Sequence, residues 1–315
     1  MDRNSKFAVV GVGPVGSIMA AHMRSAGFDV TLVDVLRGHM DAIKKNGLTI
    51  LGKKEVRAHF PAECILYSID EMAGGHFDVV FVSVKASILP KITPTLKSAV
   101  KQGTTLISLQ NGLDTEDFIA NAFGKENTLR IIVNYAGNIV EDGKVKLSFF
   151  NAPNHIGMIE PSAEMNARKM AELITAAGME TAFTPDIKKY EWEKVILNAA
   201  LSPVCALTKR TMKQMMDCED TRNLVKEILR EGIDVAKARG ISLPSDFMEF
   251  SLRYLDNAGH HKTSMHVDLD KGSPTEIDFI NGKIVEHGKK AGVPTPVNFT
   301  IVSLIKGSEL LPHQG

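Results

Sequence analysis

A glycine-rich segment near the N-terminus has the residue types and the spacing that can bind a pyrophosphate. Gly11-Val12-Gly13-Pro14-Val15-Gly16 follows a short apolar run and opens a segment with helical apolar spacing. The first glycine makes a tight turn, the second lets the backbone approach the phosphates, and the third lets the helix pack on the strand. Pro14 is tolerated at a helix start, where the early N–H groups have no partner inside the helix and can bind an anion. The sequence therefore favours a dinucleotide-binding loop over a merely structural turn, and we expect Gly11, Gly13, Pro14, Val15 and Gly16 to bind the cofactor.

An acidic residue, Asp34, closes the β-branched run that follows this segment. A carboxylate here can accept hydrogen bonds from the ribose hydroxyls of the adenosine and would repel a 2′-phosphate, which favours NADH over NADPH. Arg37, three residues later, could offset this preference by pairing with a phosphate. The alternative is that Asp34 only caps the next helix.

A polar stripe interrupts an apolar helical segment in the second half of the chain. Lys194, Asn198 and Ser202 recur every four residues, so they lie along one face, over about 12 Å at ~1.5 Å per residue. The stripe either has a function or is simply solvated. Trp192, the only tryptophan, indicates that the region is packed.

A proline follows the stripe directly. Pro203 lacks an N–H and therefore frees the carbonyl of Ala199, a defect more often found where a helix bends at a site. This spacing supports a functional role for the stripe.

A second polar cluster covers residues 264–282. Thr275 is typical of a helix N-cap or of the residue before it, and Ile277, Ile280 and Ile284 have core spacing. Glu276 would then lie in a first helical turn, where interaction with the helix dipole alone could explain a carboxylate.

The histidines near this cluster do not predict a metal site. His260 and His261 are adjacent, so their side chains point apart, and no third ligand is obviously placed beside His266. We expect one histidine in a substrate loop and two solvated ones, and we expect no metal.

Alternating strand-like and helix-like segments must position these residues. Mostly parallel, doubly wound sheets arise from such alternation. The strand-like runs are 7–10, 30–33, 48–51, 79–84, 104–109, 129–133, 145–149 and 180–183, with helix-like segments at 15–23, 86–100 and 115–122. Beyond the turn at Pro185 only helical patterns follow, at about 188–207, 220–239, 245–257, 277–291 and 297–310. The sequence therefore predicts an α/β Rossmann domain, doubly wound, over residues 1–185 and an all-α C-terminal domain over residues 186–315.

Composition limits the partners and the compartment. The length of 315 residues suits two domains, and 37 basic and 37 acidic residues give zero formal charge. No basic patch for nucleic acid and no apolar run of about 18–20 residues for a membrane span is visible. Three cysteines in no metal or disulfide pattern favour a reducing cytoplasm.

Taken in order, several motifs resemble the ketopantoate reductase (2-dehydropantoate 2-reductase) family of pantothenate biosynthesis. The resemblance implies a Rossmann domain followed by a helical domain, with the active site in the cleft, and NAD(P)H-dependent reduction of a 2-oxo acid to a 2-hydroxy acid. The family's usual cofactor is NADPH. The motifs are Gly11-x-Gly13-x-x-Gly16, Val82-Ser83-Val84-Lys85-Ala86, Leu109-Gln110-Asn111-Gly112-Leu113, Trp192-x-Lys194-x-x-x-Asn198, Ser264-Met265, Thr275-Glu276-Ile277-Asp278-Phe279-Ile280-Asn281-Gly282 and Gly292-Val293-Pro294-Thr295-Pro296.

The resemblance implies roles for individual side chains. Lys194 looks like the general acid that protonates the developing alkoxide, and Asn198 like a donor to the substrate. Glu276 looks like the carboxylate that faces Lys194 and the cofactor ribose, which would keep a partly desolvated lysine charged.

Other matching positions are similar to residues that bind the cofactor or the substrate. Lys85 and Asn111 resemble residues that line the nicotinamide side of the cofactor, with Asn111 also facing the substrate, and Ala136 resembles a residue near the cofactor. Ser264 looks like the hydroxyl that binds the carboxylate end of the substrate.

Two positions depart from the family pattern, both on the substrate side. Ser202-Pro203 stands where Asn-Pro is common, and His261 stands where an Asn commonly precedes the Ser-Met pair. These changes make a related or bulkier 2-oxo acid a competitor of 2-dehydropantoate as the substrate, with Ser202 and His261 as substrate-binding candidates. The alternatives are a dehydrogenase of the 3-hydroxy acid or 6-phosphogluconate type and a non-catalytic dinucleotide-binding protein. The C-terminal helices could support a homodimer.

Overall fold

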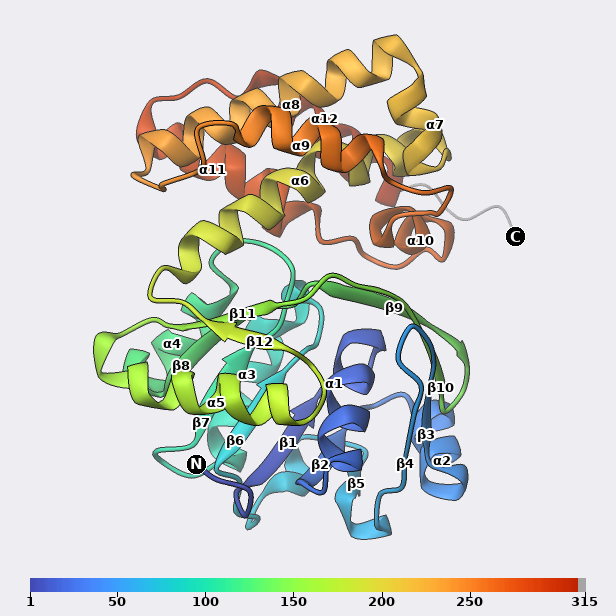
Figure 1. Cartoon of the computed structure of the whole chain (residues 1–315), viewed down its shortest axis with the longest axis vertical. Coiled ribbons are helices and arrows are strands. Elements are labelled where there is room, and N and C mark those ends of the chain that lie inside the picture. Colours follow the sequence, from blue (N-terminus) through green and yellow to red (C-terminus); the bar gives the residue numbers. More distant parts are fainter. Residues whose placement is uncertain (311–315) are drawn as a thin grey trace. The chain divides into compact units, whose positions relative to one another are not determined.

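The computed structural model describes residues 1–310, which divide into two compact units. The first unit comprises Met1–Gln110 and Asp114–Ile187, and the second comprises Asn111–Leu113 and the chain from Lys188 onward. Residues 311–315, the end of the expected helical domain, lie outside the described residues. Within residues 1–310 every strand belongs to the first unit, and the second consists of helices and loops (Figure 1).

An eight-stranded sheet forms the centre of the first unit (Figure 1). Its order is β12-β11-β8-β7-β6-β1-β2-β5, and all neighbours are parallel except β11 and β8. From β5 to β8 this order is the 3-2-1-4-5-6 order of dinucleotide-binding sheets. The strands are β1 (Lys6–Val10), β2 (Asp29–Val33), β5 (Ile65–Leu66), β6 (Val79–Val82), β7 (Thr105–Ser108), β8 (Thr128–Ile132), β11 (Asn154–Met158) and β12 (Thr181–Phe183).

Helices cover both faces of this sheet, which explains why Phe7–Val10 of β1 and the whole of β6 are apolar and buried on both faces. In β1, Phe7 and Val9 belong to one hydrophobic core, whereas Ala8 and Val10 belong to another. Alternate residues of a strand point to opposite faces, so these cores lie on the two sides of the sheet. The helices of this unit are α1 (Pro14–Ser25), α2 (Arg37–Asn46), α3 (Leu89–Ala99), α4 (Thr115–Phe123) and α5 (Glu164–Ala176).

The sequence prediction was wrong about the strand after β2. The run at 48–51 was expected to continue the main sheet, but the strand beside β2 is Ile65–Leu66. Leu48–Gly52 (β3) instead belongs to a separate four-stranded sheet of order β4-β3-β10-β9, which also contains the expected strand near 145–149. A strand of two residues carries no periodicity that a sequence pattern could reveal. The other strands of the small sheet are β4 (Val56–Ala58), β9 (Tyr135–Glu141) and β10 (Lys144–Phe150).

The second unit is a bundle of helices around one hydrophobic core. The expected helix at 277–291 is interrupted: a 3₁₀ turn over Ile277–Phe279 precedes α11, and Ile280 between them has φ −103° and ψ −95°. Ile277, Ile280 and Ile284 are buried, as their spacing predicted. None of the helices within residues 1–310 is long and apolar enough to cross a membrane. The helices are α6 (Ile187–Thr208), α7 (Met212–Asp217), α8 (Glu219–Ala238), α9 (Phe247–Asp256), α10 (Ser264–Asp270), α11 (Asn281–Ala291) and α12 (Pro296–Glu309).

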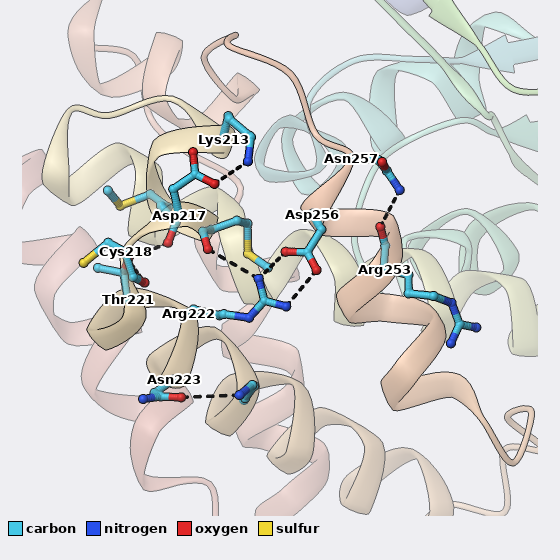
Figure 2. A network of polar contacts seen from close by, with 12 residues as sticks. Lys213, Asp217, Cys218, Thr221, Arg222, Asn223, Arg253, Asp256 and Asn257 are labelled. Carbon is cyan, nitrogen blue, oxygen red and sulfur yellow. Dashed lines mark hydrogen bonds and ion pairs between the residues drawn. The ribbon is translucent and has the colours of Figure 1, made fainter.

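A polar cluster fixes the end of α9 against α8 (Figure 2). The Arg222 guanidinium binds both carboxylate oxygens of Asp256, with Nη2 to Oδ2 at 2.7 Å, and its Nη1 also donates to the carbonyl of Met216. Arg–carboxylate pairs with two parallel hydrogen bonds have a defined geometry. Asp256 is the last residue of α9, so this pair holds the point from which the chain runs on to α10.

Candidate active site

Contacts within the protein differ among the three glycines of the predicted dinucleotide loop. Gly11 has φ +94°, and a Cβ there would lie 2.6 Å from the backbone nitrogen of Val84. At Gly16 a Cβ would lie 2.0 Å from the carbonyl oxygen of Gly11, so α1 can approach the loop only without a side chain. Contacts within the protein thus explain the first and third glycines.

Gly13 differs, because among residues 1–310 no packing contact requires a glycine at this position. A Cβ at Gly13 would meet no atom of residues 1–310 within 4 Å, and the φ of −69° is accessible to any residue. It is the N-cap of α1, followed by Pro14 as the first helical residue, and it has no side-chain cap. Open space at a helix N-terminus fits a pyrophosphate, which the early N–H groups and the helix dipole would bind. The loop residues therefore fit a dinucleotide.

The Asp34 carboxylate is tied to the backbone on both sides. Its Oδ2 accepts the N–H of Val12 at 2.5 Å and its Oδ1 accepts the N–H of Leu36 at 2.9 Å. The second contact precedes α2, whose N-cap is Leu36, so Asp34 does not cap that helix directly. Each oxygen keeps a further lone pair, so the half-buried carboxylate can also accept from ribose hydroxyls.

A residue that the sequence analysis gave no role, Ser83, holds the loop from the neighbouring strand end. Its hydroxyl donates to the carbonyl of Gly11 at 2.6 Å. A polar residue directly after the apolar strand β6 was the only signal of this contact. Two residues later Lys85 is the N-cap of a 3₁₀ turn over Ala86–Ile88 and is half-buried. Ala136, also half-buried, lies on β9 in the small sheet.

The predicted polar stripe lies on α6, a helix with an otherwise mostly buried surface. Lys194, Asn198 and Ser202 are all half-buried. Trp192 is packed as expected, with its ring 5.3 Å from that of His287.

The proline in α6 does not mark a site by itself. The carbonyl of Ala199, which Pro203 leaves without its helical partner, accepts the Nδ2 of Asn281 at 3.1 Å. Asn281 is fully buried and also donates to Oδ1 of Asn298, whose Nδ2 donates to Glu231. The helical defect is therefore satisfied inside the bundle, and this corrects the interpretation that it signals a functional bend.

This network gives a stability prediction. Asn281→Leu should lower the free energy of unfolding by about 2–4 kcal/mol, because it leaves the Ala199 carbonyl and the Asn298 oxygen buried without a donor. Asn198→Leu, on the half-buried stripe of the same bundle, is the matched control and should change it by less than about 1 kcal/mol. Urea denaturation measures both. Equal losses in the two variants would contradict the structural role of Asn281.

The structure brings Asn111 and Glu276 together. Asn111–Leu113 belongs to the second unit although the chain on both sides belongs to the first. The segment is fixed there because Leu113 donates its N–H to the carbonyl of Phe279 at 2.9 Å, and Gly112, with φ +109°, lies against Phe279. The Nδ2 of Asn111 is 3.5 Å from Oε2 of Glu276. An amide and a carboxylate that the sequence separates by 165 positions are thus held side by side.

Ser202 and the start of α10 are also joined. Thr263, the N-cap of α10, donates its hydroxyl to the carbonyl of Ser202 at 3.2 Å and accepts the N–H of His266. Ser264 follows it as the first residue of the helix and is exposed. His261 is exposed on the preceding loop, where its carbonyl accepts the N–H of Met212.

One expectation about the histidines was wrong. His266 was expected to be solvated, but it is 2% exposed, and its Nε2 lies 3.5 Å from Oδ2 of Asp270. Burial lowers the pKa of His266, whereas Asp270 acts in the opposite direction. Asp270 also binds Lys262 at 2.5 Å. This histidine therefore packs α10 against the bundle.

Comparison with known proteins agrees with this arrangement. The family description "Ketopantoate reductase PanE/ApbA" matches residues 7–161, and "Ketopantoate reductase PanE/ApbA C terminal" matches residues 186–309. The chain is 28% identical over 303 residues to a 2-dehydropantoate 2-reductase of Streptococcus pyogenes, covering 96% of this chain and 97% of that one. It is also 28% identical over 306 residues to a 2-dehydropantoate 2-reductase of Pyrococcus horikoshii, covering 97% and 98%.

Solved structures are similar to this chain over nearly its whole length. D-mandelate dehydrogenase in a ternary structure with NADH and anilino(oxo)acetate matches with a TM-score of 0.87 and 27% identity, covering 96% of this chain and 98% of that one. The 2-dehydropantoate 2-reductase of Geobacter metallireducens matches with a TM-score of 0.85 and 26% identity, covering 96% and 99%. With both family descriptions matched along most of its length, the chain belongs to the ketopantoate reductase family and is an oxidoreductase with a nicotinamide dinucleotide cofactor.

Proposed function

We propose that this protein reduces the carbonyl of a 2-oxo acid to a hydroxyl, with Lys194 as the proton donor. The observation that carries this proposal is the half-buried stripe of Lys194, Asn198 and Ser202 on α6, in a chain of the ketopantoate reductase family. An ammonium group on a helix that is otherwise mostly buried has lost part of its hydration, so it can interact strongly with charge that develops on a substrate.

Residues of the second unit are proposed to bind the substrate and to supply the proton. A nicotinamide cofactor held by the first unit would supply the hydride that the 2-carbonyl carbon accepts. Lys194 stabilises the charge that grows on the carbonyl oxygen and then donates its proton to that oxygen. Asn198 donates a hydrogen bond to the substrate, and Ser264 binds the carboxylate end. Glu276, beside Asn111, favours the charged form of Lys194.

The first unit binds the cofactor through the glycine-rich loop, with Lys85 on the nicotinamide side and Ala136 as a further contact near the cofactor. Asn111, which belongs to the second unit, also lines the nicotinamide side. NADH is the preferred donor because Asp34 can accept from the ribose hydroxyls and would repel a 2′-phosphate. Val12 and Leu36 already hold this carboxylate in place, so it cannot turn away from the ribose without breaking both contacts. The structural neighbour that binds NADH supports the preference.

The cofactor preference gives a direct prediction. In side-by-side kinetics, kcat/KM with NADH should exceed that with NADPH by about tenfold or more, which is about 1.4 kcal/mol. Asp34→Ser removes the negative charge but keeps one acceptor, so it should narrow or invert the ratio. Arg37→Ala is the control, because Arg37 stacks on the Tyr67 ring at 5.3 Å and should move the ratio less. A tenfold preference for NADPH in the unmodified enzyme would contradict the assignment.

The acid is 2-dehydropantoate or a bulkier relative. Ser202 is shorter than the asparagine common at its position, and His261 replaces an asparagine with an imidazole. The D-mandelate dehydrogenase neighbour was solved with anilino(oxo)acetate, a carboxylate that carries an aromatic ring next to its amide carbonyl. A panel of 2-oxo acids that includes 2-dehydropantoate and phenylglyoxylate distinguishes these cases. Faster oxidation of a 3-hydroxy acid or of 6-phosphogluconate than of any 2-hydroxy acid would favour the alternative dehydrogenase types.

Two further points stay predictions. A homodimer through the C-terminal helices would cover the exposed side chains of Phe250 and Tyr254 on α9 and of Phe299 on α12. A cytoplasmic location follows only from the pattern of the cysteines.

A further inference from the structure

A buried histidine outside the expected site lies directly behind the glycine-rich loop. His39 is in α2 and is 2% exposed. Gly143, in the turn between β9 and β10, donates its N–H to Nδ1 of His39 at 3.1 Å. Because Nδ1 accepts this bond, the proton of the neutral ring is on Nε2. The small sheet therefore fixes the tautomer of a histidine in the main α/β layer.

The other ring nitrogen faces α1. Nε2 of His39 lies 3.5 Å from Oγ of Ser17, at the long end of hydrogen-bond distances. Ser17 is fully buried and donates its hydroxyl to the carbonyl of Val12 at 2.9 Å. Since the hydroxyl proton is directed at Val12, a lone pair of the Ser17 oxygen is left for the Nε2–H group. A continuous path thus joins the β9–β10 turn to the loop.

The end of this path controls the direction of a peptide group. The Val12–Gly13 peptide is planar and trans, so its C=O and N–H point in opposite directions. A bond that fixes the Val12 carbonyl therefore also fixes the Gly13 N–H, at the loop position with open space around it. On the other side, the Val12 N–H is bound by Asp34. Both peptide groups of Val12 are held by buried or half-buried side chains.

The surroundings of the His39 ring favour its neutral form. Burial lowers the pKa of His39, and the carboxylates of Asp142, with Oδ1 3.9 Å from Nδ1, and then Asp34 act in the opposite direction. The neutral form is therefore favoured near pH 7 and keeps Nδ1 free to accept from Gly143.

We propose that His39 and Ser17 are positioning residues for the dinucleotide: they orient the Gly13 N–H toward the pyrophosphate before the cofactor arrives. Preorganised donors raise affinity because binding then orders less of the protein. The proposal rests on the binding of a nicotinamide dinucleotide and not on which acid is reduced. Its effect should appear in the affinity for NADH and not in the chemical step.

The test is NADH titration, followed by protein fluorescence or calorimetry, on Ser17→Ala, His39→Asn, His39→Gln and the double variant. Asparagine can place an acceptor near Nδ1 but does not reach Ser17, whereas glutamine can place an N–H donor near Nε2. His22→Asn is the matched control, because His22 is a buried histidine of α1 whose pKa is likewise lowered by burial and whose ring interacts with the backbone at Ala177. The melting temperature of each variant reports folding separately.

Ser17→Ala and His39→Asn should each raise the Kd for NADH by about tenfold. The Kd of the double variant should not exceed that of the weaker-binding single variant, because both substitutions break the same chain of hydrogen bonds. His39→Gln should stay within about threefold of the parent, and kcat at saturating NADH within about twofold in all of them. An unchanged Kd in Ser17→Ala, additive losses in the double variant, or an equal rise in His22→Asn would overturn the proposal. Because NADH binding is read without a 2-oxo acid, failure here is separable from failure of the proposed reaction.

Discussion

Lys194→Ala should lose about 10²- to 10⁴-fold in kcat, the range that a positioned general acid contributes. The alkoxide that forms at C2 would then have neither the ammonium charge that stabilises it nor the proton that it takes up. The Kd for NADH should change little, because the glycine-rich loop that binds the dinucleotide is in the other compact unit. Single-turnover kinetics with saturating NADH isolate this loss from any change in product release.

A matched variant separates catalysis from damage to the helix. Lys189 is in the same helix, five positions earlier, with its Nζ 5.5 Å from the centre of the Tyr190 ring. Lys189→Ala removes the same side chain from a different face of α6 and should leave kcat within about twofold. Near-normal turnover in Lys194→Ala would remove the proposed acid, and an equal loss in Lys189→Ala would point to the helix instead of the ammonium group.

Gly13 and Gly16 lie at the N-cap and in the first turn of α1. Substitution by alanine should impair cofactor binding at Gly13 and stability at Gly16. Gly13→Ala places a Cβ where no atom of the described chain, residues 1–310, lies within 4 Å. The free energy of unfolding should therefore fall by only about 0.5–1 kcal/mol, from the poorer N-cap. The methyl group would occupy the space that we assign to the pyrophosphate, so the Kd for NADH should rise by about tenfold or more. Gly13→Ala thus loses cofactor binding while it keeps its fold.

Gly16→Ala should instead lower the stability of the fold. Its Cβ would lie 2.0 Å from the Gly11 oxygen and 2.4 Å from Oγ of Ser83, neither of which has room to retreat without moving the loop. The free energy of unfolding should fall by about 1–3 kcal/mol or more, as overpacking costs. Thermal denaturation and NADH titration on the pair provide the readout. A destabilised Gly13→Ala that still binds NADH normally would contradict the assignment of that space to the cofactor.

Sequence patterns predicted the elements with strong periodicity and the residues at the ends of strands. The Gly11–Gly16 turn, the buried spacing of Ile277, Ile280 and Ile284, and the packing of Trp192 could be predicted because each depends on near neighbours in the chain. The position of β5 beside β2 could not, since two residues carry no period and only tertiary pairing defines them. For the same reason the run at 48–51 was placed in the wrong sheet.

Contacts between distant segments explain what was missed around the site. Pro203 correctly predicted that the Ala199 carbonyl has no partner within the helix. That carbonyl accepts a hydrogen bond from Asn281, 82 positions away. His39 and Ser17 carry no motif, and only the fold places the ring between α1 and the β9–β10 turn. The roles of Lys194, Asn198, Ser264 and Glu276 rest on the family resemblance, and they stay predictions until variants are measured.

Isotope transfer tests the central claim most directly. The enzyme is incubated with [4,4-²H₂]NADH and the 2-oxo acid that it reduces fastest, and the product is analysed by mass spectrometry. If the cofactor delivers a hydride to the carbonyl carbon, the 2-hydroxy acid gains one deuterium at C2, and the same product made in ²H₂O with unlabelled NADH carries none there. A product without deuterium at C2 from the labelled cofactor, or no 2-hydroxy acid from any member of the panel, would contradict the proposed reaction.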